Sequence, residues 1–264
     1  MFPHMASIGW IQQALADPPS IDATVDRDAA AAAAEQHDLG IDQPSERVDA
    51  FVEMLPSLLE WFRHEHRDYP WRRTRDPWKV LIAEILLQRT KARYVDQLFD
   101  DFLARFPDPE TVYQADEDEI FDAVETLGFG NKRTSTLTAL ATTLVEEHHG
   151  EVPADLESLQ ALPRIGPYTA RACLCFAFGK PLALVDANIG VVVERIFGYH
   201  SSRRPHKDQS LYAFLDALIP DGPDLARVFN LALLDLRDAI CTNPPNCADC
   251  PLNDGCLYAA SARE

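Results

Sequence analysis

Apolar side chains recur at helical spacing along most of this chain. From Val48 onward they return every three or four positions, as one face of an α-helix requires. Clear runs are Phe51, Leu55, Leu58, Leu59 and Phe62, then Leu81, Ile85 and Leu86, then Val95, Leu98 and Phe102, then Leu211, Phe214, Leu215 and Leu218. Strand-like alternation is nearly absent, and turn sequences such as FPDP, LGFGN, LPRIGP and IPDGP interrupt the pattern. The pattern predicts an all-α fold of about ten helices.

Residues 1–45 do not follow this pattern. They are rich in Ala, Asp and Pro, as in DRDAAAAAAEQHDLGIDQPSER, and they contain few aromatic residues. Such a composition offers little apolar surface to bury. We expect a poorly ordered or loosely helical acidic extension here, followed by the folded part of the protein.

Composition and charge narrow the class of protein. The 264 residues are 47% hydrophobic, enough for one large domain or two small ones. No apolar run approaches the roughly 20 residues needed to cross a bilayer, and the N-terminus lacks the pattern of a signal peptide. We therefore expect a cytoplasmic protein without a membrane partner, and a monomer.

The net charge is −18, which at first argues against a nucleic-acid ligand. However, 19 of the 24 basic residues are arginine, and the acidic residues are spread along the whole chain. This composition resembles that of proteins from a high-salt, halophile-like cytoplasm. Salt screens the Coulomb part of DNA binding there, so the overall charge does not exclude DNA.

Four of the six cysteines lie in one short segment, CTNPPNCADCPLNDGC, at positions Cys241, Cys247, Cys250 and Cys256. In a reducing compartment such a group favours metal over disulfides. Structural zinc usually takes two separate C-x2-4-C pairs, whereas this segment has one short pair with outlying cysteines. A single loop around a [4Fe–4S] cluster is the better geometric match, with zinc as the alternative.

The sequence ALPRIGPYTARACLCFAFG predicts two helices joined by a short turn. Gly166 stands at the turn and Pro167 can be the first residue of the second helix. The N–H groups at such a helix start can hold a phosphate oxygen, although an ordinary helix–helix turn would look the same.

Two acidic residues stand in apolar surroundings. Asp186, in LALVDANIG, suits the N-cap of a helix, and a capped carboxylate can also stabilise a developing cation. Glu84, in WKVLIAEILLQRTKA, projects from an apolar helix, where burial favours the protonated form of a carboxyl group. A structural ion pair of Glu84 with Arg89 or Arg93 is the alternative.

Together, the C-x6-C-x2-C-x5-C loop, the LPxxGxYTA hairpin and the VDAN aspartate resemble the endonuclease III superfamily of DNA glycosylases over about residues 48–260. The resemblance implies a two-lobed, all-α helix–hairpin–helix fold. It implies a six-helix barrel over 70–180, and a lobe from 46–69 and 181–264 whose cysteine loop holds a [4Fe–4S] cluster. The implied partner is double-stranded DNA with a mismatched or damaged base.

The resemblance also implies roles for single residues. Asp186 matches the catalytic aspartate and Glu84 a glutamate shared by MutY and the archaeal mismatch glycosylases. Tyr168 stands where bifunctional members carry a Schiff-base lysine, which a phenol cannot replace, so a monofunctional enzyme is expected. The implied DNA-contacting residues are Gln88, Arg89 and Phe129 as wedges at the extruded base, and Arg164, Gly166 and Thr169 in the hairpin.

Some positions depart from the family pattern. Arg164 replaces a usual glycine of the hairpin, Leu231 replaces the polar residue that MutY enzymes place near adenine, and Ala187 replaces their glycine after the aspartate. The chain also ends eight residues after Cys256, without the C-terminal domain of MutY proteins. These features favour removal of thymine or uracil mispaired with guanine. A MutY-type adenine glycosylase and a non-enzymatic iron–sulfur DNA-binding module are the alternatives.

Overall fold

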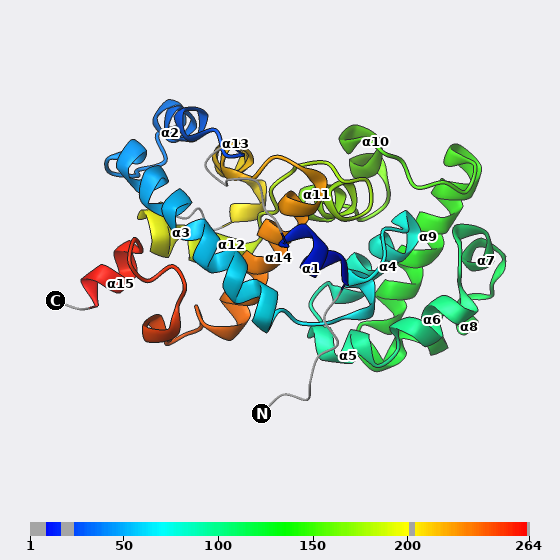
Figure 1. The fold of residues 1–264 in the computed structure, drawn as a ribbon. Coiled ribbons are helices and arrows are strands. Elements are labelled where there is room, and N and C mark those ends of the chain that lie inside the picture. The colour runs from blue at the N-terminus through cyan, green and yellow to red at the C-terminus, as the bar shows by residue number, and fades with distance from the viewer. Residues whose placement is uncertain (1–8, 17–23, 201–203, 263–264) are drawn as a thin grey trace. The chain divides into compact units, whose positions relative to one another are not determined.

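The computed structural model describes residues 9–16, 24–200 and 204–262 (Figure 1). These residues form α-helices and short 3-10 turns, and no strand occurs among them. The predicted all-α fold is therefore confirmed. The chain divides into two compact units, one within Met1–Asp68 and Gly179–Glu264 and the other over Tyr69–Phe178. Within the described ranges, no helix is long and apolar enough to span a membrane.

The unit over Tyr69–Phe178 consists mainly of short helices, with α9 (Gly130–His148) as its longest. Its helices are α4 (Pro77–Leu87), α5 (Ala92–Asp96), α6 (Phe99–Arg105), α7 (Pro109–Gln114), α8 (Glu117–Val124), α9 (Gly130–His148), α10 (Leu156–Ala161) and α11 (Pro167–Phe176), with 3-10 turns at Pro70–Arg72 and Glu125–Leu127. Helix α9 packs against α7 and α8, and α4 packs against α11. Because α4 is apolar on almost every side, most of its side chains are buried.

The other unit contains both ends of the chain. Its helices are α1 (Gly9–Ala14), α2 (Arg27–Gln36), α3 (Pro44–Glu65), α12 (Ala187–Phe197), α13 (Gln209–Leu218), α14 (Pro223–Ala239) and α15 (Leu257–Ser261), with 3-10 turns at Pro205–Lys207 and Cys247–Asp249. An aromatic cluster joins four of these helices. The ring of Phe197 lies 5.1 Å from those of Phe51 and Phe214, and Phe51 lies 6.3 Å from Phe229.

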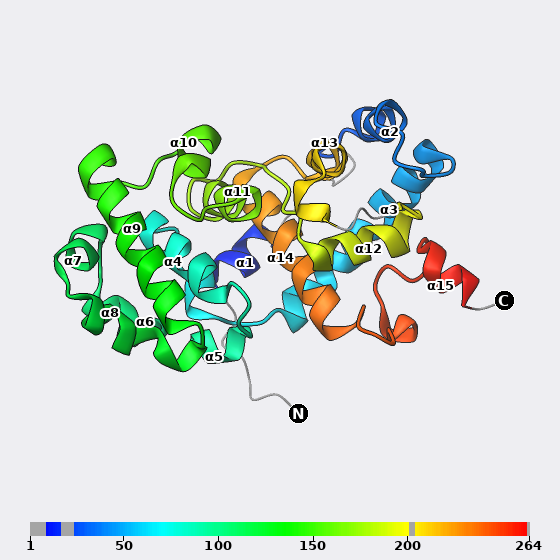
Figure 2. The same cartoon turned by 180° about the vertical axis from the view of Figure 1, so that it is seen from behind.

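Within residues 1–45, expected to be poorly ordered or loosely helical, residues 27–36 are helical. They form α2, which packs against α13 and α3 (Figures 1 and 2). The Asp26 side chain caps the helix by accepting from Ala29 N at 2.9 Å. Ala30 and Ala34 are buried at this contact. Alanine has the highest helix propensity, and its small side chain lets two helices approach closely, so an Ala-rich run can join a core without large apolar residues. Residues 1–8 and 17–23 of the expected extension lie outside the described residues.

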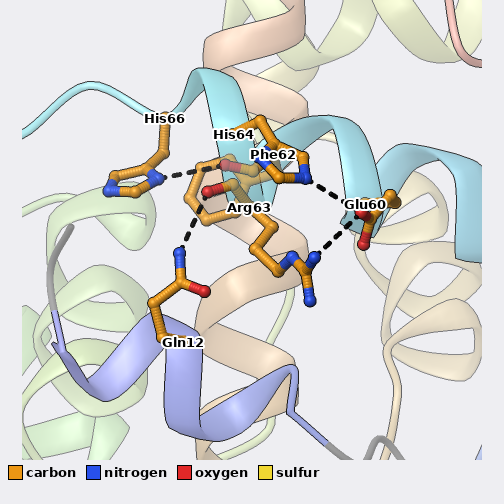
Figure 3. Close-up of polar contacts among 6 residues, drawn as sticks. All are labelled: Gln12, Glu60, Phe62, Arg63, His64 and His66. Atoms are coloured by element: carbon orange, nitrogen blue, oxygen red, sulfur yellow. Dashed lines mark hydrogen bonds and ion pairs between the residues drawn. The ribbon is translucent and has the colours of Figure 1, made fainter. Parts of the chain in front are cut away.

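Helix α1 is also attached to its unit. Gln12 donates from Nε2 to the carbonyl oxygen of Arg63 at 3.3 Å, near the end of α3 (Figure 3). On the same stretch of α3, Glu60 accepts from Arg63 and His64 at 3.1 and 2.9 Å. The Trp10 ring lies 4.4 Å from the guanidinium carbon of the buried Arg227 in α14, a cation–π contact.

A buried ion pair joins the residues after α3 to α14. Asp235, only 1% exposed, accepts from the backbone N of Arg67 at 3.0 Å and from its Nε at 2.7 Å. Arg67 also donates to Asp238 at 2.7 Å. The two bonds to Asp235, with a further contact from Arg67 Nη2 at 2.6 Å, offset the cost of burying its carboxylate. The pair therefore fixes the register between the end of α3 and α14.

Candidate functional site

Asp186 is the N-cap of α12. Its Oδ1 accepts from the backbone N of Ile189 at 2.8 Å, and its Oδ2 accepts from Asn188 Nδ2 at 2.9 Å. Each carboxylate oxygen keeps a further lone pair, and the side chain is half-buried. Both oxygens are therefore fixed in direction while the group can still face a ligand.

Three side chains, two from α13 and one from α14, form hydrogen bonds with the extended segment before Asp186. Asp216 in α13 accepts from Ala183 N at 2.8 Å, and the Tyr212 hydroxyl donates to Val185 O at 3.3 Å. Asn230 in α14 accepts from Leu184 N at 2.9 Å and donates to Leu182 O at 3.0 Å. Asn230 is 2% exposed, so it satisfies backbone groups that would otherwise be buried without partners. These three positioning residues were missed in the sequence, where nothing distinguishes them from the other polar residues of α13 and α14.

Glu84 lies in α4, where it is 7% exposed, on a helix that packs against α11. Cys173 of α11 is fully buried, and this burial raises the pKa of its thiol to about 12, with the negative charge of nearby Glu84 adding to the effect. Glu84 in α4 and the hairpin helix α11 therefore belong to one packed pair of helices. Cys173 itself is an unreactive core residue.

The hairpin between α10 and α11 leaves the N-terminus of α11 uncovered by any side-chain cap. Gly166 is the N-cap and makes no side-chain hydrogen bond, and Pro167 is the first helical residue. Arg164 is exposed and has φ of 65°, the left-handed region that favours glycine. Tyr168 is half-buried in the first turn of α11. Thr169 is 5% exposed, so a contact with DNA would come from its backbone N–H.

The two predicted wedge loops are exposed. Gln88 and Arg89 follow the end of α4, and Arg89 has φ of 59°. Phe129 precedes α9, has φ of 56° and is 61% exposed, the largest exposure among the large apolar side chains of the described residues. Water does not favour such a surface, so an aromatic ring held outward suits a partner with flat apolar groups, such as nucleic-acid bases.

The cysteine loop packs against α12 and α3. Arg195 of α12 donates from Nη1 to Cys241 Sγ at 3.1 Å and to the carbonyl oxygens of Cys241 and Thr242, both at 2.8 Å. Cys256 donates from Sγ to the Arg195 carbonyl at 3.2 Å. Gly255 N donates to Met54 Sδ in α3 at 3.1 Å, an approach that leaves no room for a Cβ at position 255.

The four cysteines of the loop are free thiols, and none of them is in a disulfide. The pKa of Cys250 is raised to about 11, mainly by burial and in smaller part by charge on Cys256, Cys241 and Cys247, so the four sulfurs are close enough to interact. Yet, in the part of the chain that the structure describes, no three His, Cys, Asp or Glu side chains are grouped to hold one metal ion. Four free thiols in one loop, close enough to interact, are the donor set that an iron–sulfur cluster or zinc requires.

The structure thus brings the predicted residues into two groups. Glu84, the hairpin and the two wedge loops belong to the unit over Tyr69–Phe178. Asp186 and the four cysteines belong to the other unit, and α12 carries Asp186 at its start and Arg195 near its end.

Comparison with known proteins identifies the family. The model of the HhH-GPD superfamily of base excision DNA repair proteins matches residues 82–219. The chain belongs to this superfamily. A thymine-DNA glycosylase of Aeropyrum pernix is 39% identical over 76% of this chain and 92% of its own length. A thymine/uracil-DNA glycosylase of Pyrobaculum aerophilum is 37% identical over 79% of the chain and 92% of its own length.

Other HhH-GPD relatives are more distant. An adenine DNA glycosylase of Mycobacterium tuberculosis is 36% identical over 76% of the chain, which spans 66% of that protein. Among solved structures, a thermostable thymine-DNA glycosylase has a TM-score of 0.77 and 33% identity, over 83% of this chain and all of that one. An endonuclease III–DNA complex, at 21% identity and a TM-score of 0.67, shares the fold. The predicted family, its fold and the class of base-excision DNA glycosylase are confirmed, and a non-enzymatic module is not supported.

Arg164 gives a test of the hairpin. Replacing it by glycine, Arg164→Gly, should leave the free energy of unfolding within about 1 kcal/mol, because relief of the left-handed conformation offsets the flexibility of glycine. A lost phosphate contact should make the slope of log K against log salt shallower by about one. The checks are thermal melting and a salt series of DNA-binding constants. Gln43→Gly, at another exposed left-handed residue with φ of 53°, is the control and should leave the salt slope unchanged.

Proposed function

We propose that this protein is a monofunctional mismatch glycosylase that removes thymine or uracil paired with guanine in double-stranded DNA. The observation that carries the proposal is its similarity to thymine and thymine/uracil glycosylases over nearly their whole length. Leu231 adds support, since it is a buried apolar residue where the resemblance to MutY would place a polar one. We also propose that the enzyme acts as a monomer. Its barrel lobe would be the unit over Tyr69–Phe178, and the other unit would be the cluster lobe.

The proposed reaction is hydrolysis of the N-glycosidic bond. As this bond breaks, positive charge builds on the sugar and negative charge on the departing base. The carboxylate of Asp186, fixed by Ile189 N and Asn188, would stabilise the sugar cation. Water then adds its hydroxyl to the sugar carbon, and its remaining proton goes to the base or replaces the one that Glu84 has given to the base. Glu84, in its apolar surroundings, would supply a proton or hydrogen bond on the base side.

Tyr168 sets the type of product. A phenol cannot form a Schiff base with the sugar, so the strand would stay intact at the abasic site. Gln88, Arg89 and Phe129 would fill the space left by the extruded base. Arg164 and the uncapped N-terminus of α11, with Gly166 and the N–H of Thr169, would hold a phosphate.

A MutY-type adenine glycosylase acting opposite guanine or 8-oxoguanine is the second candidate. The similarity to the Mycobacterium tuberculosis adenine DNA glycosylase supports it, and Glu84 and Tyr168 suit both reactions. Only the choice of base separates the two candidates, because the bond broken is the same.

For the cofactor we propose a [4Fe–4S] cluster on Cys241, Cys247, Cys250 and Cys256. The family resemblance implies that such a cluster shapes a DNA-contacting region and takes no part in bond cleavage. The Nη1 of Arg195, at 3.1 Å from Cys241 Sγ, would add a charge-assisted hydrogen bond to a ligand sulfur.

Excision from a panel of duplexes tests the function. With T·G, U·G, A·G and A·8-oxoguanine pairs, at low and at molar salt, we expect loss of thymine and uracil only. The product should be an abasic strand that breaks only in alkali, with no adduct trapped by borohydride. Faster release of adenine would move the assignment to the second candidate, and a trapped adduct at the yield of the reaction would refute the monofunctional mechanism.

Asp186→Asn separates the charge of this residue from its capping role. Asparagine caps a helix as well as aspartate does, so melting should not change. Loss of the carboxylate should lower the single-turnover excision rate by about 100- to 1,000-fold, with little change in DNA binding. Asp155→Asn, at another aspartate N-cap, is the control and should keep full activity. Near-normal turnover of Asp186→Asn would leave Asp186 as a helix cap only.

Metal analysis tests the cofactor. Protein purified without oxygen should be brown and contain about four iron atoms per chain. Cys247→Ser should lose iron and DNA binding, whereas Cys173→Ala, at a buried cysteine outside the loop, should retain both. Stoichiometric zinc without iron would contradict the cluster.

A further inference from the structure

Arg133 in α9 joins the two wedge loops through its guanidinium group. Nε donates to Gly128 O at 3.0 Å, in the loop that carries Phe129. Nη1 donates to the carbonyl oxygens of Ile85 and Leu86 at 2.9 and 3.1 Å. Nη2 donates to Gln88 O at 2.9 Å and to Thr90 Oγ1 at 2.5 Å, on either side of Arg89. All five N–H donors of the side chain therefore have acceptors.

The surroundings of this guanidinium suit hydrogen bonding to backbone carbonyl groups rather than binding of an anion. Arg133 is 5% exposed, and burial lowers its pKa. Its acceptors are four carbonyl oxygens and one hydroxyl, all neutral. Ile85 and Leu86 lie in the last turn of α4, where a cation is stabilised by the helix dipole, and Ile85 O also accepts from Gln88 N at 3.3 Å. The charge is thus offset by dipoles that belong to the loop itself.

Both loops need such support. Arg89 and Phe129 adopt left-handed backbone conformations, with φ of 59° and 56°. For residues other than glycine this costs about 1 kcal/mol or more each. Such conformations persist where surrounding contacts fix them. The backbone N of Arg133 also donates to Phe129 O at 3.0 Å, so one residue holds both strained positions.

We propose that Arg133 is a positioning residue for base extrusion, which keeps the Arg89 and Phe129 loops at a fixed separation so that they enter the DNA together. This inference rests on the proposed function, because it takes these loops to be the wedge. The separation of the loops is fixed before DNA arrives, so the ordering cost is met during folding rather than during binding.

Arg133→Lys tests the proposal. Lysine keeps the charge, but its single nitrogen cannot reach acceptors spread across two loops. The probe is a duplex with 2-aminopurine beside the base that the panel identifies as substrate, on a 2′-fluorinated sugar that resists cleavage. A rise in fluorescence then reports extrusion alone. We expect its rate to fall at least ten-fold, while binding of abasic product DNA stays close to that of the unmodified protein. Loss of buried hydrogen bonds should lower the melting temperature, so the assays are run well below it.

A second substrate separates positioning from general damage. Opposite an abasic analogue the target base is unpaired, and excision by Arg133→Lys should fall less than three-fold, against at least thirty-fold in the paired duplex. Thr90→Val removes one acceptor and should show a smaller loss, again larger on the paired duplex than opposite the abasic analogue. It replaces Arg133→Lys in the test if that variant does not fold. Arg105→Lys is the matched control, since Arg105 donates at 2.9 Å to the Glu119 carbonyl away from both loops. It should behave like the unmodified protein.

Equal losses on the two substrates, or an unchanged fluorescence rise in both Arg133→Lys and Thr90→Val, would overturn the proposal. Failure of the proposed function would look different. Excision of adenine rather than thymine or uracil would appear in the unmodified protein, and the comparison of variants would then be made on that base.

Discussion

Backbone groups at helix ends, which have no partner inside the helix, are the constraint on which this structure depends. An all-α protein has many such ends, and each must be satisfied by a side chain, by water or by a ligand. Asp186 satisfies the start of α12, and Arg133 satisfies the end of α4. At α11 the N-cap is Gly166, which has no side chain to offer. Some helix ends in this protein are thus satisfied by side chains of the proposed site, and the start of α11 is left without a side-chain cap.

Preorganisation at Asp186 is built in layers. The carboxylate is oriented by α12, and the segment before it is oriented by α13 and α14 through Asp216 and Asn230. The same α14 is bound to the end of α3 through Asp235 and Arg67. An electrostatic group that stabilises a short-lived cation is effective only if it does not have to move during the reaction. The buried polar residues of this unit supply that rigidity.

Local patterns predicted much of this molecule. Hydrophobic periodicity predicted helices from Val48 onward. The position of Asp186 before an apolar run predicted its role as a helix cap, and cysteine spacing predicted a metal-binding loop. The packing of helix α2 against α13 and α3 was not predicted, because alanine packing leaves little hydrophobic pattern. Asn230 and Arg133 were missed for another reason, since their acceptors and donors lie more than forty residues away along the chain. Spacing reports which face of a helix is buried, but not which distant carbonyl a buried donor meets.

The two kinds of arginine contact respond differently to ions in solution. Arg164 is exposed, and attraction between such a group and a phosphate weakens as salt rises. Arg133 is buried and bound to carbonyl dipoles, which mobile ions cannot reach. At high salt, the proposed phosphate contact of Arg164 would therefore weaken, while the geometry of the two loops that Arg133 joins would not change. Raising the salt concentration would then slow association with DNA without changing the spacing of the two loops.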